Sequence, residues 1–174
     1  MKTTVGRGRR GLRSIPVSDY VILCEDDILF AKDALKYFEW ARDEYKNDKQ
    51  VFSICGYSRD KATEPEYFKI QRNPWFTPWG WATWADRFED IKAVLAHRLN
   101  DHDSWDQITN YAIRKDRNEI RPLLARTQNI GGELGTYCPG PGWHRQHQFN
   151  GHWAGDVEVG DGTFFEELKK SKAA

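Results

Sequence analysis

Three consecutive carboxylates are the residues of this sequence best suited to chemistry. Glu25, Asp26 and Asp27 directly follow an apolar run at 20–24, and apolar residues resume at 28–30. Carboxylate oxygens are the ligands that Mg²⁺ and Mn²⁺ prefer, and such an ion in turn binds substrate phosphates. The alternative is a solvated turn whose acid precedes a helix. Because the acids separate two apolar segments, we favour a ligand site.

The segments around these acids predict an α/β fold. The run at 20–24 lacks alternation, which indicates a strand covered on both faces, as in a parallel sheet. Apolar residues at helical spacing predict a helix over 34–45 with Asp33 as its N-cap, and a second strand follows at 51–55. This order fits a right-handed βαβ unit. The acids then lie at the carboxyl end of a strand, where open α/β sheets bind ligands.

The rest of the chain shows weaker patterns. They predict mostly loop at 58–83, an amphipathic helix at 88–99, a further helix from Ser104 and a late strand at 123–130. The length of 174 residues predicts one domain. We place a basic flexible arm at 1–19, the main folded domain at 20–165 and a charged tail, expected to fray, at 166–174.

Composition bounds the partners and the location. The 26 basic and 26 acidic side chains balance, so the net charge argues against an electrostatic binder of nucleic acid. No segment approaches the roughly 20 apolar residues of a membrane span. The three cysteines lie far apart, which favours a reducing compartment. We expect no nucleic-acid partner, no transmembrane segment and a cytoplasmic location, with attachment at a membrane surface as the alternative.

Three segments together resemble bacterial glycosyltransferases of the GT-A fold. They are the acidic run at 23–28, the turn at 53–57 and the tryptophan block at 79–84. The pattern is similar to the N-acetylglucosaminyltransferase I-like and family 2-like nucleotide-sugar transferases, and it extends from Tyr20 to Thr136. The resemblance implies a GT-A-like, Rossmann-like mixed sheet flanked by helices. It also implies inverting transfer of a sugar from a nucleotide diphosphate sugar to a hydroxyl of a carbohydrate or glycan acceptor.

The resemblance also implies roles for the acids. Asp27 matches the last acid of the family's motif and would ligate Mn²⁺ or Mg²⁺, which bridges the donor diphosphate. Glu25 and Asp26 would orient the ribose and the sugar of the donor. A divalent ion at this position stabilises the charge that develops on the leaving nucleotide diphosphate.

Inversion requires a base for the acceptor hydroxyl. Asp106 resembles the family's base, and Asp103 and Asp101 are the next candidates. The alternative is structural, because residues 104–107 form a capping-box pattern and the helix dipole favours an acid in the first turn. Both interpretations of Asp106 stay open.

The tryptophans of the 79–84 block also have two interpretations. Trp79, Trp81 and Trp84 are candidates for an acceptor platform, because sugars stack their apolar faces on aromatic rings. Alternatively, the rings fill the core beneath the site. Gly80 between two of them indicates a close approach of the backbone.

Charged residues late in the chain are further candidates. His144 and His147 could complete metal coordination, as a late histidine does in several GT-A enzymes, and Arg145 between them could contact the diphosphate. A closed zinc site is not evident, since Cys138 is the only thiol nearby. The alternative is that neither histidine has a metal role.

One departure from the family leaves other functions open. Nineteen residues precede Tyr20, which is too few for the strands that bind the donor base in the family. Either the base is recognised differently, or the N-terminal part of the nucleotide-binding half is missing. A short sheet also exposes an edge, which favours a homodimer. The other functions are a non-catalytic carbohydrate-binding or interaction module and a different Mg²⁺-dependent enzyme acting on phosphate esters.

Overall fold

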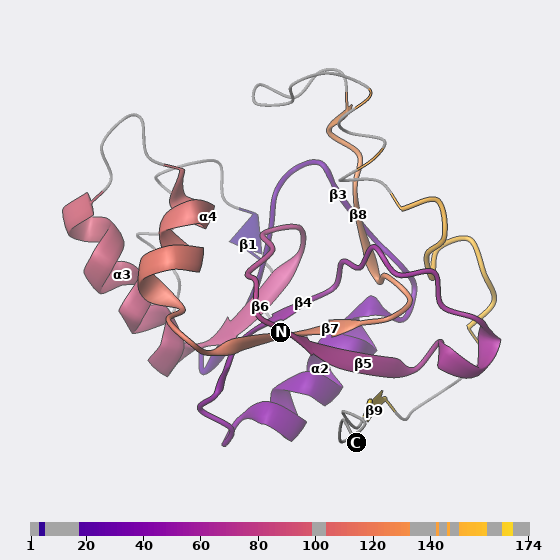
Figure 1. Cartoon of the computed structure of the whole chain (residues 1–174), viewed down its shortest axis with the longest axis horizontal. Coiled ribbons are helices and arrows are strands. Elements are labelled where there is room, and N and C mark those ends of the chain that lie inside the picture. The colour runs from indigo at the N-terminus through magenta and orange to yellow at the C-terminus, as the bar shows by residue number, and fades with distance from the viewer. Residues whose placement is uncertain are drawn as a thin grey trace, which may run out of the picture.

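The structure is a computed structural model of the 174-residue chain. It describes residues 4–5, 18–98, 104–132, 142, 146, 150–159 and 165–168, with the backbone alone at 4–5 and 96–98. Within these residues the fold is mixed α/β, with a mixed sheet flanked by helices (Figure 1). The expected class is confirmed at this level.

Seven strands form the main sheet. Their order across it is β1 (Thr4–Val5), β2 (Tyr20–Cys24), β6 (Trp81–Trp84), β4 (Val51–Cys55), β7 (Asn118–Pro122), β5 (Lys69–Asn73) and β9 (Glu166–Glu167). β1, β2, β4 and β7 run in one direction, and β6, β5 and β9 run in the other. The carboxyl ends of β2, β4 and β7 therefore share one edge of the sheet, which we call the carboxyl edge.

Helices cover both faces of this sheet. α2 (Ala34–Tyr45), at the expected position, packs on one face, and its buried residues share a core with those of β2, β4 and β6. α3 (Ala85–Arg98) covers the other face together with α4 (Trp105–Ile108), which continues as the π-helix η2 (Thr109–Ile113). The core between the sheet and these helices contains Phe52, Phe76, Trp81, Phe88, Ile91, Leu95 and Ile113. The two apolar faces explain why the central strands lack polar alternation.

A separate antiparallel ribbon stands beside the carboxyl edge. It pairs β3 (Ile28–Phe30) with β8 (Thr127–Asn129), and Figure 1 shows it across from α4. The fully buried Arg126 precedes β8, and its Nε lies 3.0 Å from Oδ2 of Asp33. Asp33 is at the N-cap of α2 as expected, but among the described residues it makes no capping hydrogen bond with its side chain. Its carboxylate binds Arg126 instead.

Several short strands add to the sequence expectations. Residues 58–83 are mostly loop, as expected, but they also contain the 3₁₀ turn η1 (Glu64–Glu66), β5 and the start of β6. The late strand expected at 123–130 is shorter than expected: β8 covers only Thr127–Asn129, and β7 ends just before the expected range, at Pro122. β2 and β4 have the parallel orientation of a βαβ unit, but β6 lies between them.

Two segments expected to be mobile are partly paired. In the tail, Glu166 and Glu167 form β9 on β5, and Lys69 lies beside Glu166 as an ion pair. In the arm, β1 pairs with Leu23 and Cys24 at the carboxyl end of β2. Backbone pairing with a neighbouring strand holds these residues in place despite their charged or glycine-rich surroundings.

Candidate functional site

The acidic triplet lies in the turn between β2 and β3, at the carboxyl edge. The turn is closed by the amide of Ile28, which donates to the carbonyl of Glu25 at 3.3 Å. The side chains of Glu25 and Asp26 are exposed, while that of Asp27 is half-buried. The sheet therefore places the three acids where the sequence predicted them, after a strand that is covered on both faces.

Asp27 is held against the end of the β3–β8 ribbon. Its carbonyl accepts the amide of Ile130 at 2.8 Å, and Asn129 Oδ1 accepts the amide of Gly131 at 2.9 Å. A Cβ added to Gly131 would lie 2.1 Å from Oδ2 of Asp27, so any other residue at this position would require the Asp27 carboxylate to move. Asp27 Oδ1 is buried and has no hydrogen-bond partner among the residues that the structure describes.

A buried carboxylate oxygen without a hydrogen-bond partner is a candidate for binding a ligand. A buried acceptor without a partner costs free energy, roughly 1–3 kcal/mol, unless a ligand satisfies it. A divalent cation would satisfy Asp27 Oδ1 in this way. The orphaned atom and the glycine beside it therefore fit the metal that the resemblance implies for Asp27.

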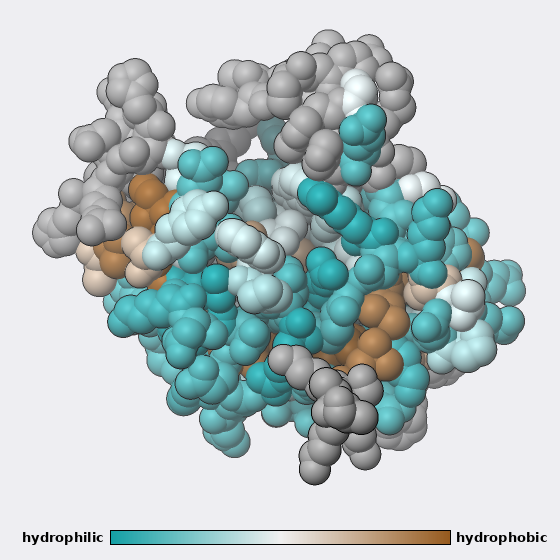
Figure 2. Space-filling model, in the orientation of Figure 1, coloured by the Kyte–Doolittle hydropathy of each residue, from teal (hydrophilic) through white to brown (hydrophobic). Residues whose placement is uncertain are grey.

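Glu25 shows that acids from distant parts of the sequence converge here. Desolvation by the surrounding protein raises its pKa to about 7, and the charges of Asp27, Asp106 and Asp26 add to this rise. The side chain of Glu25 is nevertheless exposed to water. Figure 2 shows that most of the described surface on this face is hydrophilic.

Asp106 enters the site from α4. It lies in the first turn of this helix, is partly buried, and accepts a short hydrogen bond from Ser104 Oγ. Ser104 occupies the N-cap, yet within the described part of the chain its side chain makes no capping hydrogen bond. The capping box expected between Ser104 and Gln107 is therefore not formed at this described end of α4. The charge of Asp106 contributes to the raised pKa of Glu25, so Asp106 lies near the triplet, and its role as a base stays a prediction.

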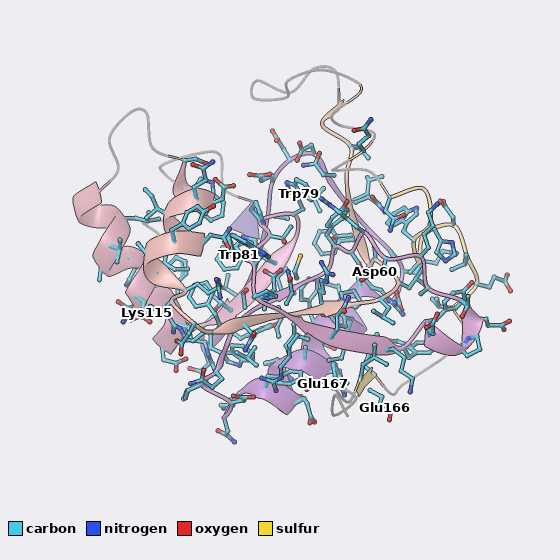
Figure 3. All side chains as sticks on the ribbon, in the orientation of Figure 1. Asp60, Trp79, Trp81, Lys115, Glu166 and Glu167 are labelled. Carbon is cyan, nitrogen blue, oxygen red and sulfur yellow. The ribbon has the colours of Figure 1, made fainter. Side chains whose placement is uncertain are left out.

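The three tryptophans separate into one site residue and two core residues. Trp81 and Trp84 are only 2% and 3% exposed, and they belong to cores on opposite faces of the sheet. The interpretation of Trp81 and Trp84 as part of an acceptor platform is therefore wrong, because rings buried by their neighbours have no face free for a sugar. Trp79 is partly exposed and contacts Tyr57 edge to face, with 4.7 Å between the ring centroids. Figure 3 places it toward the β3–β8 ribbon.

The other predicted site residues lie outside the described residues. These are Asp101, Asp103, His144, Arg145 and His147. Among the residues that are described, no group of three or more His, Cys, Asp or Glu side chains could hold a metal ion. A site of this kind would need oxygen atoms from a substrate to complete its coordination.

The sequence analysis missed residues at the end of β4. Arg59 is exposed and is hydrogen-bonded to the side chain of Tyr57, whose pKa is raised by desolvation although Arg59 lowers it. Both follow Gly56, the residue that ends the second predicted strand. The signal was present, because the carboxyl end of a second parallel strand reaches the same edge as the triplet. Arg59 supplies a cation at this edge.

Comparisons with known proteins do not place the chain in a family. Neither the models of protein families nor the curated proteins contain a match to it. In the described residues, no helix is long and apolar enough to cross a membrane.

Proposed function

We propose that this protein is a metal-dependent glycosyltransferase of GT-A-like fold, which moves a sugar from a nucleotide diphosphate sugar to an acceptor hydroxyl with inversion. The observation that carries the proposal is the orphaned oxygen of Asp27 at the carboxyl edge, beside Glu25, whose raised pKa reflects in part the charge of Asp106. The edge position is the usual ligand site of open α/β sheets.

The described residues fit a divalent ion that is shared with the substrate. Mg²⁺ usually binds one or two carboxylates together with substrate phosphates, so a three-ligand protein cluster is not required. Asp27 would hold Mn²⁺ or Mg²⁺ through Oδ1, and the bound ion would stabilise charge on the leaving diphosphate as a Lewis acid. Glu25 and Asp26 present exposed acceptors to the hydroxyls of the donor. Arg59 would contact a diphosphate oxygen.

Asp106 serves as the base in this proposal. The acceptor oxygen attacks the anomeric carbon, the bond from that carbon to the diphosphate oxygen breaks, and the diphosphate leaves with the electron pair. The proton of the acceptor hydroxyl passes to a carboxylate oxygen of Asp106. Ser104 Oγ, which donates to Asp106, holds that carboxylate in one orientation.

Calorimetric titration tests the metal role of Asp27. We would titrate the chain with UDP, GDP, CMP and dTDP, with and without Mn²⁺. One nucleotide should bind in a metal-dependent manner, and Asp27→Asn should weaken this binding about tenfold or more, because an amide oxygen replaces a charged ligand. The matched control is Asp43→Asn, an exposed acid on α2.

Two results would contradict the proposal. The first is that no nucleotide binds in the presence of Mn²⁺. The second is that Asp27→Asn binds the metal and nucleotide as tightly as the wild type. Glycan binding without nucleotide binding would instead support a non-catalytic carbohydrate-binding module.

A further inference from the structure

The turn that follows β8 is held by one buried side chain. Asn129, the last residue of β8, is 2% exposed, and its Oδ1 accepts the amide of Gly131 at 2.9 Å. The amide of Ile130, between them, donates to the carbonyl of Asp27 at 2.8 Å. Asparagine forms such bonds to the backbone two residues further on more readily than most residues do. The side chain of Asn129 therefore fixes where the backbone of Gly131 lies relative to Asp27.

The strand that carries this turn is itself fixed. In the ribbon of β3 and β8, Asn129 lies opposite Ile28, the residue after Asp27 (Figure 1). The fully buried side chain of Gln128 donates from Nε2 to the carbonyl of Asn150 at 2.8 Å, and its Oε1 accepts the amide of Asn150 at 2.9 Å. The turn at Gly131 therefore extends from a strand whose position is set on both sides.

Space, and not backbone conformation, accounts for glycine at position 131. Gly80 and Gly132 have a positive φ, whereas Gly131 does not. A Cβ at Gly131 would instead meet the Asp27 carboxylate, at 2.1 Å from Oδ2 and 3.1 Å from Cγ. The lack of a side chain at Gly131 therefore determines where the carboxylate of Asp27 can lie.

This contact bears on the oxygen that would hold the ion. Oδ2 of Asp27 lies toward Gly131, while the buried Oδ1 has no hydrogen-bond partner within the described ranges. A carboxylate that packs against fixed backbone is preorganised, so it loses less orientational freedom when it binds a ligand. The turn after β8 thus acts on the geometry of the proposed metal ligand.

We propose that Gly131 and Asn129 are positioning residues that hold the Asp27 carboxylate in the orientation in which it binds a divalent ion. The inference rests on the proposed function for the ion itself. Gly131 acts by leaving space for the carboxylate, and Asn129 acts by fixing the backbone of Gly131. Neither residue needs to touch the ion or the substrate.

A role in stability alone predicts a different behaviour of Gly131→Ala. The added methyl group meets the end of a side chain, so the carboxylate of Asp27 can move and the fold is kept. Its distance from Oδ2 must rise from 2.1 Å to at least 3.0 Å. That displacement exceeds the tolerance of about 0.5 Å within which a functional site must hold its groups. Ion binding should therefore weaken while stability changes little.

A Mn²⁺ titration of Gly131→Ala tests this inference without requiring activity. The electron paramagnetic resonance signal of free Mn²⁺ would be followed for Mn²⁺ alone and with UDP, GDP, CMP or dTDP. We expect Gly131→Ala to weaken Mn²⁺ binding about 10–100-fold, as is usual when a residue that orients a metal ligand is changed. Its thermal unfolding midpoint should stay close to that of the wild type. Gly151→Ala is the matched control, because no atom of the described residues lies within 4 Å of a Cβ added there.

Two variants of Asn129 test its part in the arrangement. Asn129→Ala removes the acceptor for the Gly131 amide and should also weaken Mn²⁺ binding. Asn129→Ser keeps a short acceptor for that amide, so it should weaken the binding less. An equal loss in the two variants would contradict the role of Asn129. This comparison also decides the inference if Gly131→Ala does not fold.

The outcomes separate this inference from the transferase proposal. If Gly131→Ala binds Mn²⁺ as tightly as the wild type does, the inference is overturned and the proposed function is untouched. A lower thermal midpoint without weaker Mn²⁺ binding has the same meaning, since the role of Gly131 is then structural. If the wild type binds no Mn²⁺ with or without nucleotide, the proposed function fails and the inference fails with it.

Discussion

Asp106 has two competing interpretations, and its hydrogen bonds bear only on the capping one. A capping role would place a side-chain oxygen on the free amides of the first helical turn. Instead, Ser104 Oγ donates to Asp106, and the charge of Asp106 contributes to the raised pKa of Glu25. An acid in this turn still gains from the helix dipole. That gain is compatible with a second role as a base.

We predict that Asp106→Asn lowers the rate of sugar transfer by about 10²-fold or more, because an amide cannot accept the proton of the acceptor hydroxyl. Asparagine keeps the shape and the acceptor for Ser104, so donor affinity and thermal unfolding should change little. The measurement is the initial rate of nucleoside diphosphate release, with Asp116→Asn as an exposed acidic control. Undiminished transfer would return Asp106 to a structural role.

The elements of the carboxyl edge converge on Thr127, the first residue of β8. Its Oγ1 donates to the carbonyl of Trp79 at 2.7 Å. A Cβ added to Gly56 or to Gly80 would lie 2.5 Å or 2.7 Å from Thr127 Cγ2. The amide of Gly56 also donates to the carbonyl of Gly80 at 2.8 Å. The ends of β4, β6 and β8 therefore meet with no space for further atoms.

We predict that Gly56→Ala and Gly80→Ala each lower the free energy of unfolding by about 1–3 kcal/mol, because the added methyl group overlaps Thr127. Adding Thr127→Ala should recover part of the loss at Gly56. It should recover less at Gly80, whose φ of +74° strains any side chain. Urea denaturation of the single and double variants measures this coupling, and strict additivity at Gly56 would contradict it.

The sequence predicted the elements whose pattern is long and local. β2, α2 and β4 carry five to twelve residues with a clear apolar pattern, and they form as expected. β6 was missed because its four residues are all buried and show no period. β7 carries Glu119 and Pro122, which disfavour strands, and its pairing comes from β4 and β5. Tertiary contacts decide such short strands.

At the scale of the whole molecule, the candidate site is assembled from segments that are far apart in the sequence. The triplet was predicted because its three acids are consecutive and follow a buried strand. Its contact with Gly131 could not be predicted, because a long-range approach of backbone to carboxylate leaves no local period. The contact of Trp75 with Tyr111 likewise depends on how a loop packs on η2, through the hydrogen bonds between Phe76 and Asn110. Burial in the folded molecule also decides which tryptophans have a ring face exposed for contact with a sugar.

A single acid at the centre of the sheet affects the stability of the whole molecule. Glu119 on β7 is fully buried, and its Oε2 accepts from Ser53 Oγ at 3.1 Å and from the amide of Thr77 at 2.9 Å. Within the described residues, its Oε1 has no hydrogen-bond partner. Desolvation raises the pKa of Glu119 to about 7 against the smaller lowering effect of these hydrogen bonds.

This pKa predicts how stability depends on pH. In the unfolded chain Glu119 releases its proton near pH 4.5, but in the native state it holds the proton until about pH 7. Between these values the native state binds more protons than the unfolded state, so the free energy of unfolding falls as pH rises. The total loss is about 3 kcal/mol, and the decline ends above the native pKa.

We predict that Glu119→Gln removes this part of the pH dependence, because glutamine has the shape of the protonated acid and does not ionise. Urea denaturation at several values between pH 5 and pH 8 would show the wild type losing stability relative to the variant. Any contribution from Glu25, whose pKa is also about 7, is common to both proteins and cancels in the difference. The exposed Glu44→Gln is the control and should follow the wild type. Parallel curves for the wild type and Glu119→Gln would mean that Glu119 remains ionised in the folded protein, and the local environment would then have to supply a proton donor for Oε1.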